Sequence, residues 1–513
     1  MSVSARLISG TVASWVQIGI TLITQVLLVP LYLTYWNVDT YGLWLAVIAF
    51  TGILNSLDLG YQEYLGYEFL RIGKGDTRQI NRHLSAGVLM GFTLGLFQIL
   101  IVLVIYGGGM IIALFGASSV LFDHTTAGNV CLILLMQGTA WLIFGSVGGI
   151  LNRALYVFGH FPRMAWWGVF SSIVVNLAPA LAVWLGADLL HTGMVMALAR
   201  IAANIPVWID MLLLFKQEGI RPSYPSWILG WRNFVQSLYL CISGLLENMR
   251  HQGARMLLTP LAGAAGLAAF STMRTGTNVA MQGLHTITHP LMPELMGFLH
   301  RRDQIRSDVA FGTIWIVTVM VLSPAMALIQ LFIAPVYLAW TKNQIPFDPW
   351  LFASLSVGIL VYAISQPAIA VVRGNNLLKS QVRISGLAGS ITIAGIIVLV
   401  PLLGISGGGL ALLTAEIAGY LYYNTVAIRW LKDHNLVWPA RISKITLTSV
   451  CISSAAIILL ILLPGFKLPV TLLCMAALIL NALRFWRHLP DLATETLRNI
   501  LLGIPLMKQI FCR

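Results

Sequence analysis

Residues Tyr41 to Asn81 read "YGLWLAVIAFTGILNSLDLGYQEYLGYEFLRIGKGDTRQIN". The first half is an apolar run of about 20 residues, long enough to cross the hydrocarbon core of a bilayer as a helix. The second half carries tyrosines and basic residues, and residues 60–84 are predicted to form an amphipathic helix on the membrane surface. An apolar span followed by a basic connection is typical of a protein that crosses the membrane repeatedly.

The composition of the whole chain agrees with this interpretation. Hydrophobic residues make up 58% of the 513 residues and charged residues only 10%, whereas a soluble domain carries about 25% charged residues. The chain is therefore expected to be a polytopic membrane protein. Its five cysteines are scattered without metal-binding or disulfide spacing, so neither kind of site is predicted.

Apolar segments of spanning length can be marked fourteen times along the sequence. They lie near residues 7–33, 41–60, 84–106, 128–150, 165–186, 192–215, 233–258, 265–292, 309–337, 350–372, 384–402, 407–428, 445–463 and 468–486. Fourteen spans place both termini on the same side of the membrane.

The net charge of +13 is unevenly distributed between the two faces. Almost all lysines and arginines outside the spans fall on the alternate connections that share a side with both termini. Only Lys342 and Lys467 fall on the opposite side. By the positive-inside rule both termini are expected to be cytoplasmic, and the basicity indicates topology rather than a nucleic-acid partner.

A weak internal repeat suggests how the spans are organised. "VLLVPLYL" at residues 26–33 resembles "MLLTPLAG" at residues 256–263, six spans later. An even offset predicts two parallel-related six-helix lobes around a central cavity, with the substrate site between them. The expected fold is all-α, with an N-terminal lobe at 1–220, a C-terminal lobe at 221–440, and two further helices in 441–513.

Polar residues recur at helical spacing on three of the spans. They are Ser14, Gln17, Thr21 and Gln25 on the first, Glu247, Arg250, His251 and Arg255 on the seventh, and Arg274, Asn278, Gln282, His285 and His289 on the eighth. Residues three and four apart share a helix face. A charge at the bilayer centre costs about 2.5–3.5 kcal/mol, so these stripes must face protein, water or a polar substrate.

Two explanations of the charged stripes stay open. The polar residues could satisfy one another, for example Glu247 with Arg250. However, the two spans hold three arginines and only this one acid before Glu294, which leaves a surplus of positive charge that an anion would neutralise. For Glu416, in the twelfth span, a hydrogen-bonded structural acid and a coupling site are both open.

Several segments resemble polysaccharide, or O-antigen, flippases of the multidrug/oligosaccharidyl-lipid/polysaccharide (MOP) exporter superfamily. The resemblance is carried by Tyr41–Trp44, Asp58-Leu59-Gly60, Arg71, Gly75-Asp76, "GGILNRALYVFGHFPRMAW" at 148–166 and "VLVPLLGISGGGLALLTAEIAGYL" at 398–421. It implies a two-lobed bundle whose first, second, seventh and eighth spans line a central cavity.

The resemblance also implies a function. The chain would move an undecaprenyl-pyrophosphate-linked oligosaccharide across the bacterial inner membrane by alternating access, for polysaccharide biosynthesis. It would be a transporter rather than an enzyme and would use no cofactor. Its partners would be the lipid-linked oligosaccharide, a polysaccharide polymerase and glycosyltransferases, and no nucleic acid.

The site residues expected on this basis are taken from the polar stripes. The pyrophosphate would bind Arg250, Arg255, Arg274 and His251, and the glycan would bind Gln17, Gln25, Asn278 and Gln282. Candidates for ion coupling are Glu247, His285, His289 and Glu416, where the histidines could equally be satisfied polar residues. No catalytic or metal-binding residue is predicted.

Two alternative functions are retained. The first is cation-coupled export of small molecules or drugs on the same fold, which the positive charge of the stripes disfavours. The second is a membrane glycosyltransferase or ligase, which would need paired acids on the outer face. The outer acids are sparse and unpaired in the sequence, namely Asp39, Asp123, Asp188 and Asp348.

Overall fold

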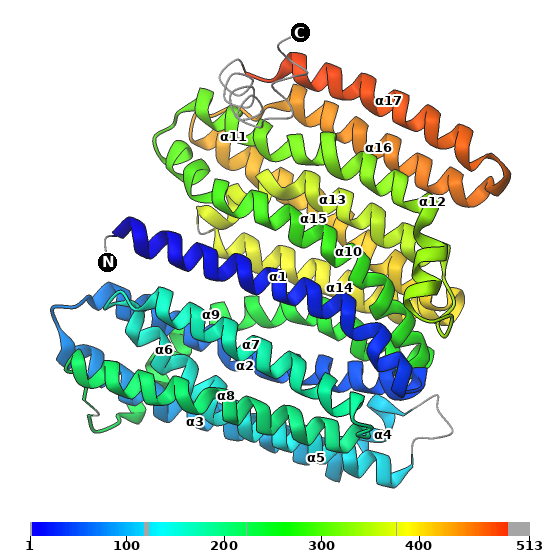
Figure 1. Cartoon of the computed structure of the whole chain (residues 1–513). Helices are drawn as coiled ribbons and strands as arrows, with labels where there is room; N and C mark the ends of the chain where they lie inside the picture. Colours follow the sequence, from blue (N-terminus) through cyan, green and yellow to red (C-terminus); the bar gives the residue numbers. More distant parts are fainter. Residues whose placement is uncertain (1–2, 117–122, 222, 376, 491–513) are drawn as a thin grey trace. The chain divides into compact units, whose positions relative to one another are not determined.

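The computed structural model describes residues 3–116, 123–221, 223–375 and 377–490 (Figure 1), and for a few of these, including Arg250, His251, His289 and Glu294, only the backbone. All regular structure in the described residues is helical. The elements are α1 (Val3–Tyr35), α2 (Val38–Ile72), α3 (Thr77–Gly107), α4 (Met110–Phe115), α5 (His124–Ala140), η1 (Trp141–Val147), α6 (Gly148–Tyr156), α7 (Phe161–Trp184), α8 (Leu189–Gln217), α9 (Trp227–Asn248), η2 (Met249–Gly253), α10 (Ala254–His300), α11 (Gln304–Val317), η3 (Thr318–Leu322), α12 (Ser323–Trp340), α13 (Pro349–Gly374), α14 (Leu378–Leu403), α15 (Ile405–Asp433), α16 (Ala440–Leu462), η4 (Pro464–Phe466) and α17 (Lys467–His488).

Joined across their π-helical turns, and with α10 divided at the kink at Gly263, the elements of the described residues form 14 long helices. In the part of the chain that the structure describes, twelve helices are long and apolar enough to cross a membrane. The two long helices outside that set are α9, which carries Arg232 and Glu247, and α15, which carries Glu416 and Arg429. The prediction of an all-α polytopic membrane protein with about 14 helices is confirmed.

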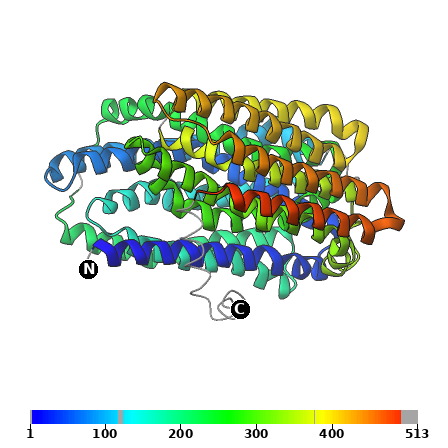
Figure 2. The ribbon, with the colours of Figure 1, turned by 90° about the horizontal axis from the view of Figure 1, so that it is seen from above.

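The chain forms two compact units. Unit 1 consists of residues 1–275, 340–346 and 396–405, and unit 2 consists of residues 276–339, 347–395 and 406–513. In unit 1 the helices α3, α5 and α8 run side by side, and in unit 2 α16 lies beside α17 (Figures 1 and 2). The lobe limits 1–220, 221–440 and 441–513 stay a prediction.

Helix α2 forms the centre of the core of unit 1. Its Tyr61, Leu65 and Phe69 are fully buried and pack with residues of α3, α6 and α8. The prediction of a surface-lying helix from residue 60 is therefore wrong for its first half, because α2 continues without a break to Ile72. Every fourth residue of this stretch is apolar and faces the other helices of unit 1 rather than the membrane surface.

Glycines allow α2 to approach its neighbours at backbone distance. A Cβ atom on Gly42 would lie 1.9 Å from the carbonyl oxygen of Ala264, and one on Gly60 would lie 2.4 Å from the backbone nitrogen of Cys241. Beside Gly42, the ring of Tyr41 stacks on that of Tyr32 at 5.7 Å. These residues of the "YGLW" and "DLG" segments thus have packing roles.

Unit 2 has a separate apolar core. Trp315 of α11 is fully buried, donates a hydrogen bond to the carbonyl oxygen of Ile364 at 2.9 Å, and lies 5.5 Å from the ring of Trp438. Helix α13 is buried along most of its length in this core. Each unit therefore has its own tightly packed scaffold.

The four acids expected on the outer face all lie at helix N-termini. The carboxylates of Asp123, Asp188 and Asp348 accept hydrogen bonds from backbone N–H groups of the helices they precede, at 2.8, 2.8 and 3.0 Å. Asp39 lies in the first turn of α2. The hydroxyl of Thr125 and the backbone N–H of Thr126 lower the pKa of Asp123 to about 2. The three capping acids satisfy otherwise unpaired N–H groups.

Candidate functional site

The seventh-span polar stripe is interrupted by a π-helical turn. Glu247 lies on α9, the turn η2 spans Met249–Gly253, and Arg255 follows on α10. A π turn bonds i to i+5, so residues on its two sides no longer follow the three-and-four spacing of a straight α-helix. The prediction that Glu247 and Arg255 share one continuous α-helical face is therefore wrong.

The π turn is anchored on α2. The side-chain amide of Asn248 donates to the carbonyl oxygen of Gly52 at 2.8 Å, and Gln252 lies against Gly52. π turns are frequent at functional sites. Here the turn offsets the residues that follow it, and Arg255 is the first charged residue after it.

Arg255 has few partners for an arginine inside an apolar helix. Its Nη1 donates a long hydrogen bond of 3.3 Å to Gln252, while its Nε is buried without a hydrogen-bond partner. No ion pair of Arg255 occurs among the described residues. A buried guanidinium has five N–H donors to satisfy, so Arg255 has capacity for an anionic ligand.

The other predicted pyrophosphate residues differ from Arg255. Arg274 is 8% exposed, and its guanidinium lies 6.0 Å from the centroid of the Phe270 ring. The side chains of Arg250 and His251 lie outside the described residues. Glu247 and Arg274 each take part in at least one further polar, ring or electrostatic interaction, so neither is without a partner.

The glycan-binding candidates are divided between the two units. On α1, Gln17 is exposed, and Gln25 is partly buried with its side-chain oxygen Oε1 lacking a hydrogen-bond partner. Asn278 and Gln282 are partly buried on the part of α10 that belongs to unit 2. Their assignment to sugar recognition stays a prediction.

Two coupling candidates have described surroundings in unit 2. The Nε2 atom of His285 lies 3.4 Å from the hydroxyl of Tyr362, and the two rings meet edge to face at 5.7 Å. Glu416 of α15 is partly buried and faces Gly358 of α13. The side chain of His289 lies outside the described residues.

Unit 1 contains a buried polar cluster that the sequence analysis did not identify. Asp58 on α2 is 0% exposed and accepts hydrogen bonds from the Trp141 indole at 3.2 Å and from the Gln62 amide at 3.1 Å. The Gln62 oxygen accepts in turn from the Arg153 guanidinium at 2.6 Å. A second arginine, Arg200, lies 5.9 Å from the Trp141 ring centroid. We call these five residues the Asp58 cluster.

A second π turn builds the Asp58 cluster. Trp141 opens η1, and the Gln62 amide also donates to the carbonyl oxygen of Gly145 in the same turn, at 3.2 Å. The space for Gln62 depends on Gly149, where a Cβ atom would lie 2.2 Å from the Gln62 oxygen. The cluster therefore couples the positions of α2, η1 and α6.

The chemistry of the Asp58 cluster is that of an enclosed acid held by neutral donors. Asp58 reaches Arg153 only through Gln62, so protonation of Asp58 would break no direct ion pair with it. Acids inside membrane spans commonly mark proton or ion pathways. The prediction placed Asp58 at a helix end, and the continuation of α2 explains why the enclosed acid was missed.

Among the described residues, no group of three or more His, Cys, Asp or Glu side chains is placed to hold a metal ion. The described cysteines Cys131, Cys241, Cys451 and Cys474 are free. The cavities of the described structure include a large apolar one in unit 1, bordered by α3, η1, α6 and α8.

The fold has solved counterparts, although no family model and no curated protein sequence matches the chain. A structure of the lipid II flippase MurJ in an inward closed conformation is 16% identical, with a TM-score of 0.64 over 93% of this chain and 98% of that chain. An inward-facing multidrug resistance MATE family transporter of the MOP superfamily is 14% identical, with a TM-score of 0.62 over 81% of this chain and 95% of that chain.

A third counterpart is a MOP superfamily transporter from Pyrococcus furiosus, described by a reversed polarity of its binding pocket that suggests a different function. It is 14% identical, with a TM-score of 0.56 over 84% of this chain and 96% of that chain. At these identities the likeness concerns the fold. The chain therefore has the fold of MOP-superfamily transporters.

Proposed function

We propose that this protein is a flippase that carries an undecaprenyl-pyrophosphate-linked oligosaccharide across a bacterial inner membrane by alternating access. The observation that carries the proposal is Arg255, a span arginine with a buried Nε that lacks a hydrogen-bond partner and with no described ion pair. Arginine suits a pyrophosphate because its planar fork donates two parallel hydrogen bonds. The lipid II flippase among the structural counterparts supports this class of cargo.

The chemistry of the residues indicates which part of the cargo each would bind. Arg255 and Arg274, with Arg250 and His251, would hold the pyrophosphate, while Gln17, Gln25, Asn278 and Gln282 would meet the sugar hydroxyls. The prenyl tail would stay in the lipid. Polysaccharide polymerases and glycosyltransferases would supply and consume the cargo.

Export of cationic compounds is the second candidate, because MATE transporters share the fold. A cation-binding cavity would need accessible acids. Asp58, the enclosed acid of unit 1, is 0% exposed and already accepts two hydrogen bonds. Asp58 is therefore not available to a cationic compound, so this acid gives no support to cation export.

Binding measurements distinguish the two candidates. Arg255→Gln is expected to weaken binding of an undecaprenyl-pyrophosphate oligosaccharide to the purified protein by about 10-fold or more, the usual effect of removing a hydrogen bond to a charged group. Arg301→Gln, in the basic connection after α10, is the matched control and should bind as the wild type. Unchanged binding in Arg255→Gln, with saturable binding of a lipophilic cation, would reject the proposal.

A further inference from the structure

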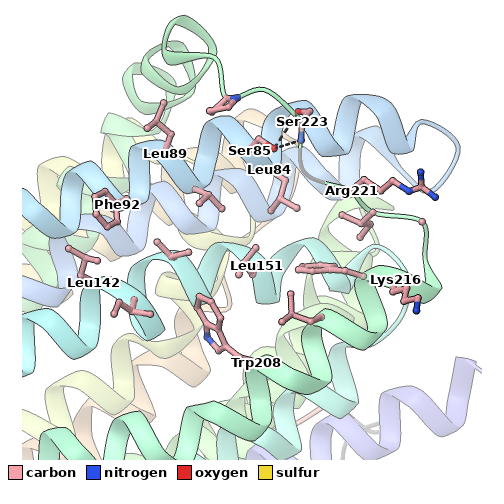
Figure 3. Close-up of a pocket in the computed structure, with 18 residues that line it drawn as sticks. Leu84, Ser85, Leu89, Phe92, Leu142, Leu151, Trp208, Lys216, Arg221 and Ser223 are labelled. Carbon is pink, nitrogen blue, oxygen red and sulfur yellow. Dashed lines mark hydrogen bonds between the residues drawn. The ribbon is translucent and has the colours of Figure 1, made fainter.

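The large cavity of unit 1 is an apolar groove with one polar end. It has a volume of about 810 Å³, within the range of ligand-binding sites. Its walls come from α3, from η1 and α6, and from α8, and the connection after α8 closes one end (Figure 3). Phe92 and Leu212 on its walls are 45% and 60% exposed, as expected for apolar side chains that face lipid.

The groove follows α3 and α8 for about two turns of each helix. On α3 its lining runs from Leu84 to Phe92, and on α8 from Lys216 back to Trp208. At 1.5 Å per residue these stretches measure about 10–12 Å. One leaflet contributes about 15 Å of hydrocarbon. The length of the groove is therefore sufficient for the part of an acyl chain that lies nearest the lipid headgroup.

The polar end of the groove is cationic. Lys216 and Arg221 line it and lie together at one end of the pocket (Figure 3), and both are exposed. Neither forms an ion pair within the part of the chain that the structure describes. The nearby Glu218 is held 2.7 Å from His160. Among the described residues that line the groove, none is acidic.

The backbone at the cationic end of the groove is held by hydrogen bonds to α3. The backbone N–H of Ser223 donates to the Ser85 hydroxyl at 2.9 Å, and the Ser223 hydroxyl donates to the carbonyl oxygen of Asn81 at 3.1 Å. The backbone N–H of Arg221 donates to the Asn81 side chain at 3.3 Å. These contacts tie the connection after α8 to the start of α3, beside the apolar groove.

From this juxtaposition we infer that the groove is a binding site for an anionic phospholipid of the leaflet that faces the basic connections. One acyl chain lies against the apolar walls, and the phosphate receives hydrogen bonds from Lys216 and Arg221. A free phosphate would leave the apolar depth of the groove unexplained, and a zwitterionic lipid would bring a cationic headgroup next to Lys216 and Arg221. The site lies within unit 1 and does not depend on which cargo the protein carries.

Native mass spectrometry of the purified protein tests this inference. Titration with phosphatidylglycerol is expected to give a saturable one-lipid adduct, and phosphatidylcholine a much weaker one. The double variant Lys216→Gln/Arg221→Gln should bind phosphatidylglycerol about 30-fold more weakly, as expected for two basic residues beside an anionic headgroup. Leu212→Trp, which fills the groove without removing charge, should also reduce the adduct.

The matched control is Arg429→Gln/Lys432→Gln, which removes two exposed basic residues from the end of α15 in unit 2. It should bind phosphatidylglycerol as the wild type does. Equal losses in both double variants would show a non-specific charge effect and overturn the inference. Adducts that form with undecaprenyl phosphate but not with phosphatidylglycerol would also overturn it, because the groove would then serve the prenyl lipid.

Discussion

Asp58→Asn is expected to abolish transport while leaving the protein folded. Asparagine keeps the size of the side chain and one oxygen acceptor, so the indole of Trp141 retains a partner in the enclosed cluster. It removes the only group of the Asp58–Gln62 pair that can gain or lose a proton. The measurement is uptake of the lipid-linked cargo into proteoliposomes, compared with the thermal unfolding temperature in detergent.

Asp58→Ala is the comparison that separates the loss of the ionisable group from the loss of the hydrogen-bond acceptor. Alanine leaves the Trp141 and Gln62 donors buried without their acceptor, and each such donor costs about 1–3 kcal/mol. This variant should therefore lose stability as well as transport. If Asp58→Asn transports at the wild-type rate, Asp58 has only a structural role and transport does not depend on its ionisation.

Gly42→Ala and Gly60→Ala are expected to cause the largest losses of stability. The added Cβ atoms would lie 1.9 Å from the carbonyl oxygen of Ala264 and 2.4 Å from the backbone nitrogen of Cys241. Backbone atoms cannot move aside as a flexible side chain can, so helix α2 must separate from its neighbours. Overpacking typically lowers the free energy of unfolding by about 1–3 kcal/mol. Because the contacts are with backbone atoms, both variants are expected at the upper end of this range.

Gly244→Ala is the matched control, because Gly244 lies on α9 and a Cβ atom added there would meet no other atom within 4 Å. Alanine there should be neutral or stabilise the helix by about 0.5–1 kcal/mol. The readout is the midpoint of thermal unfolding in detergent. A midpoint for Gly42→Ala equal to that of Gly244→Ala would contradict the close packing of α2.

The all-helical, multi-span fold was largely predictable from the sequence. Hydropathy reports the length of apolar helix that a bilayer requires, and this requirement is the same for every span. The error at residues 60–72 arose because tyrosines and charges there resemble an interfacial helix, while Tyr61, Leu65 and Phe69 are in fact packed inside unit 1. Tertiary packing, rather than the local pattern, determines the position of residues 60–72.

The candidate site was less predictable, for a geometric reason. Helical spacing identified Arg255 and Arg274, but a π turn at Met249–Gly253 changes the register between Glu247 and Arg255. The Asp58 cluster joins Asp58 to Trp141 and Arg153, which lie more than 80 residues away in the sequence. No local pattern connects such residues, so only the three-dimensional structure identifies the cluster.

The central claim is that the cargo is an anionic pyrophosphate lipid. The most direct test is translocation of a fluorescent undecaprenyl-pyrophosphate oligosaccharide across proteoliposomes, with a lipophilic cation measured in parallel. Wild-type protein should translocate the pyrophosphate lipid faster than protein-free liposomes do and should not transport the cation. Arg255→Gln should slow translocation of the pyrophosphate lipid by about 10-fold or more. Cation transport that is indifferent to Arg255, without movement of the pyrophosphate lipid, would contradict the claim.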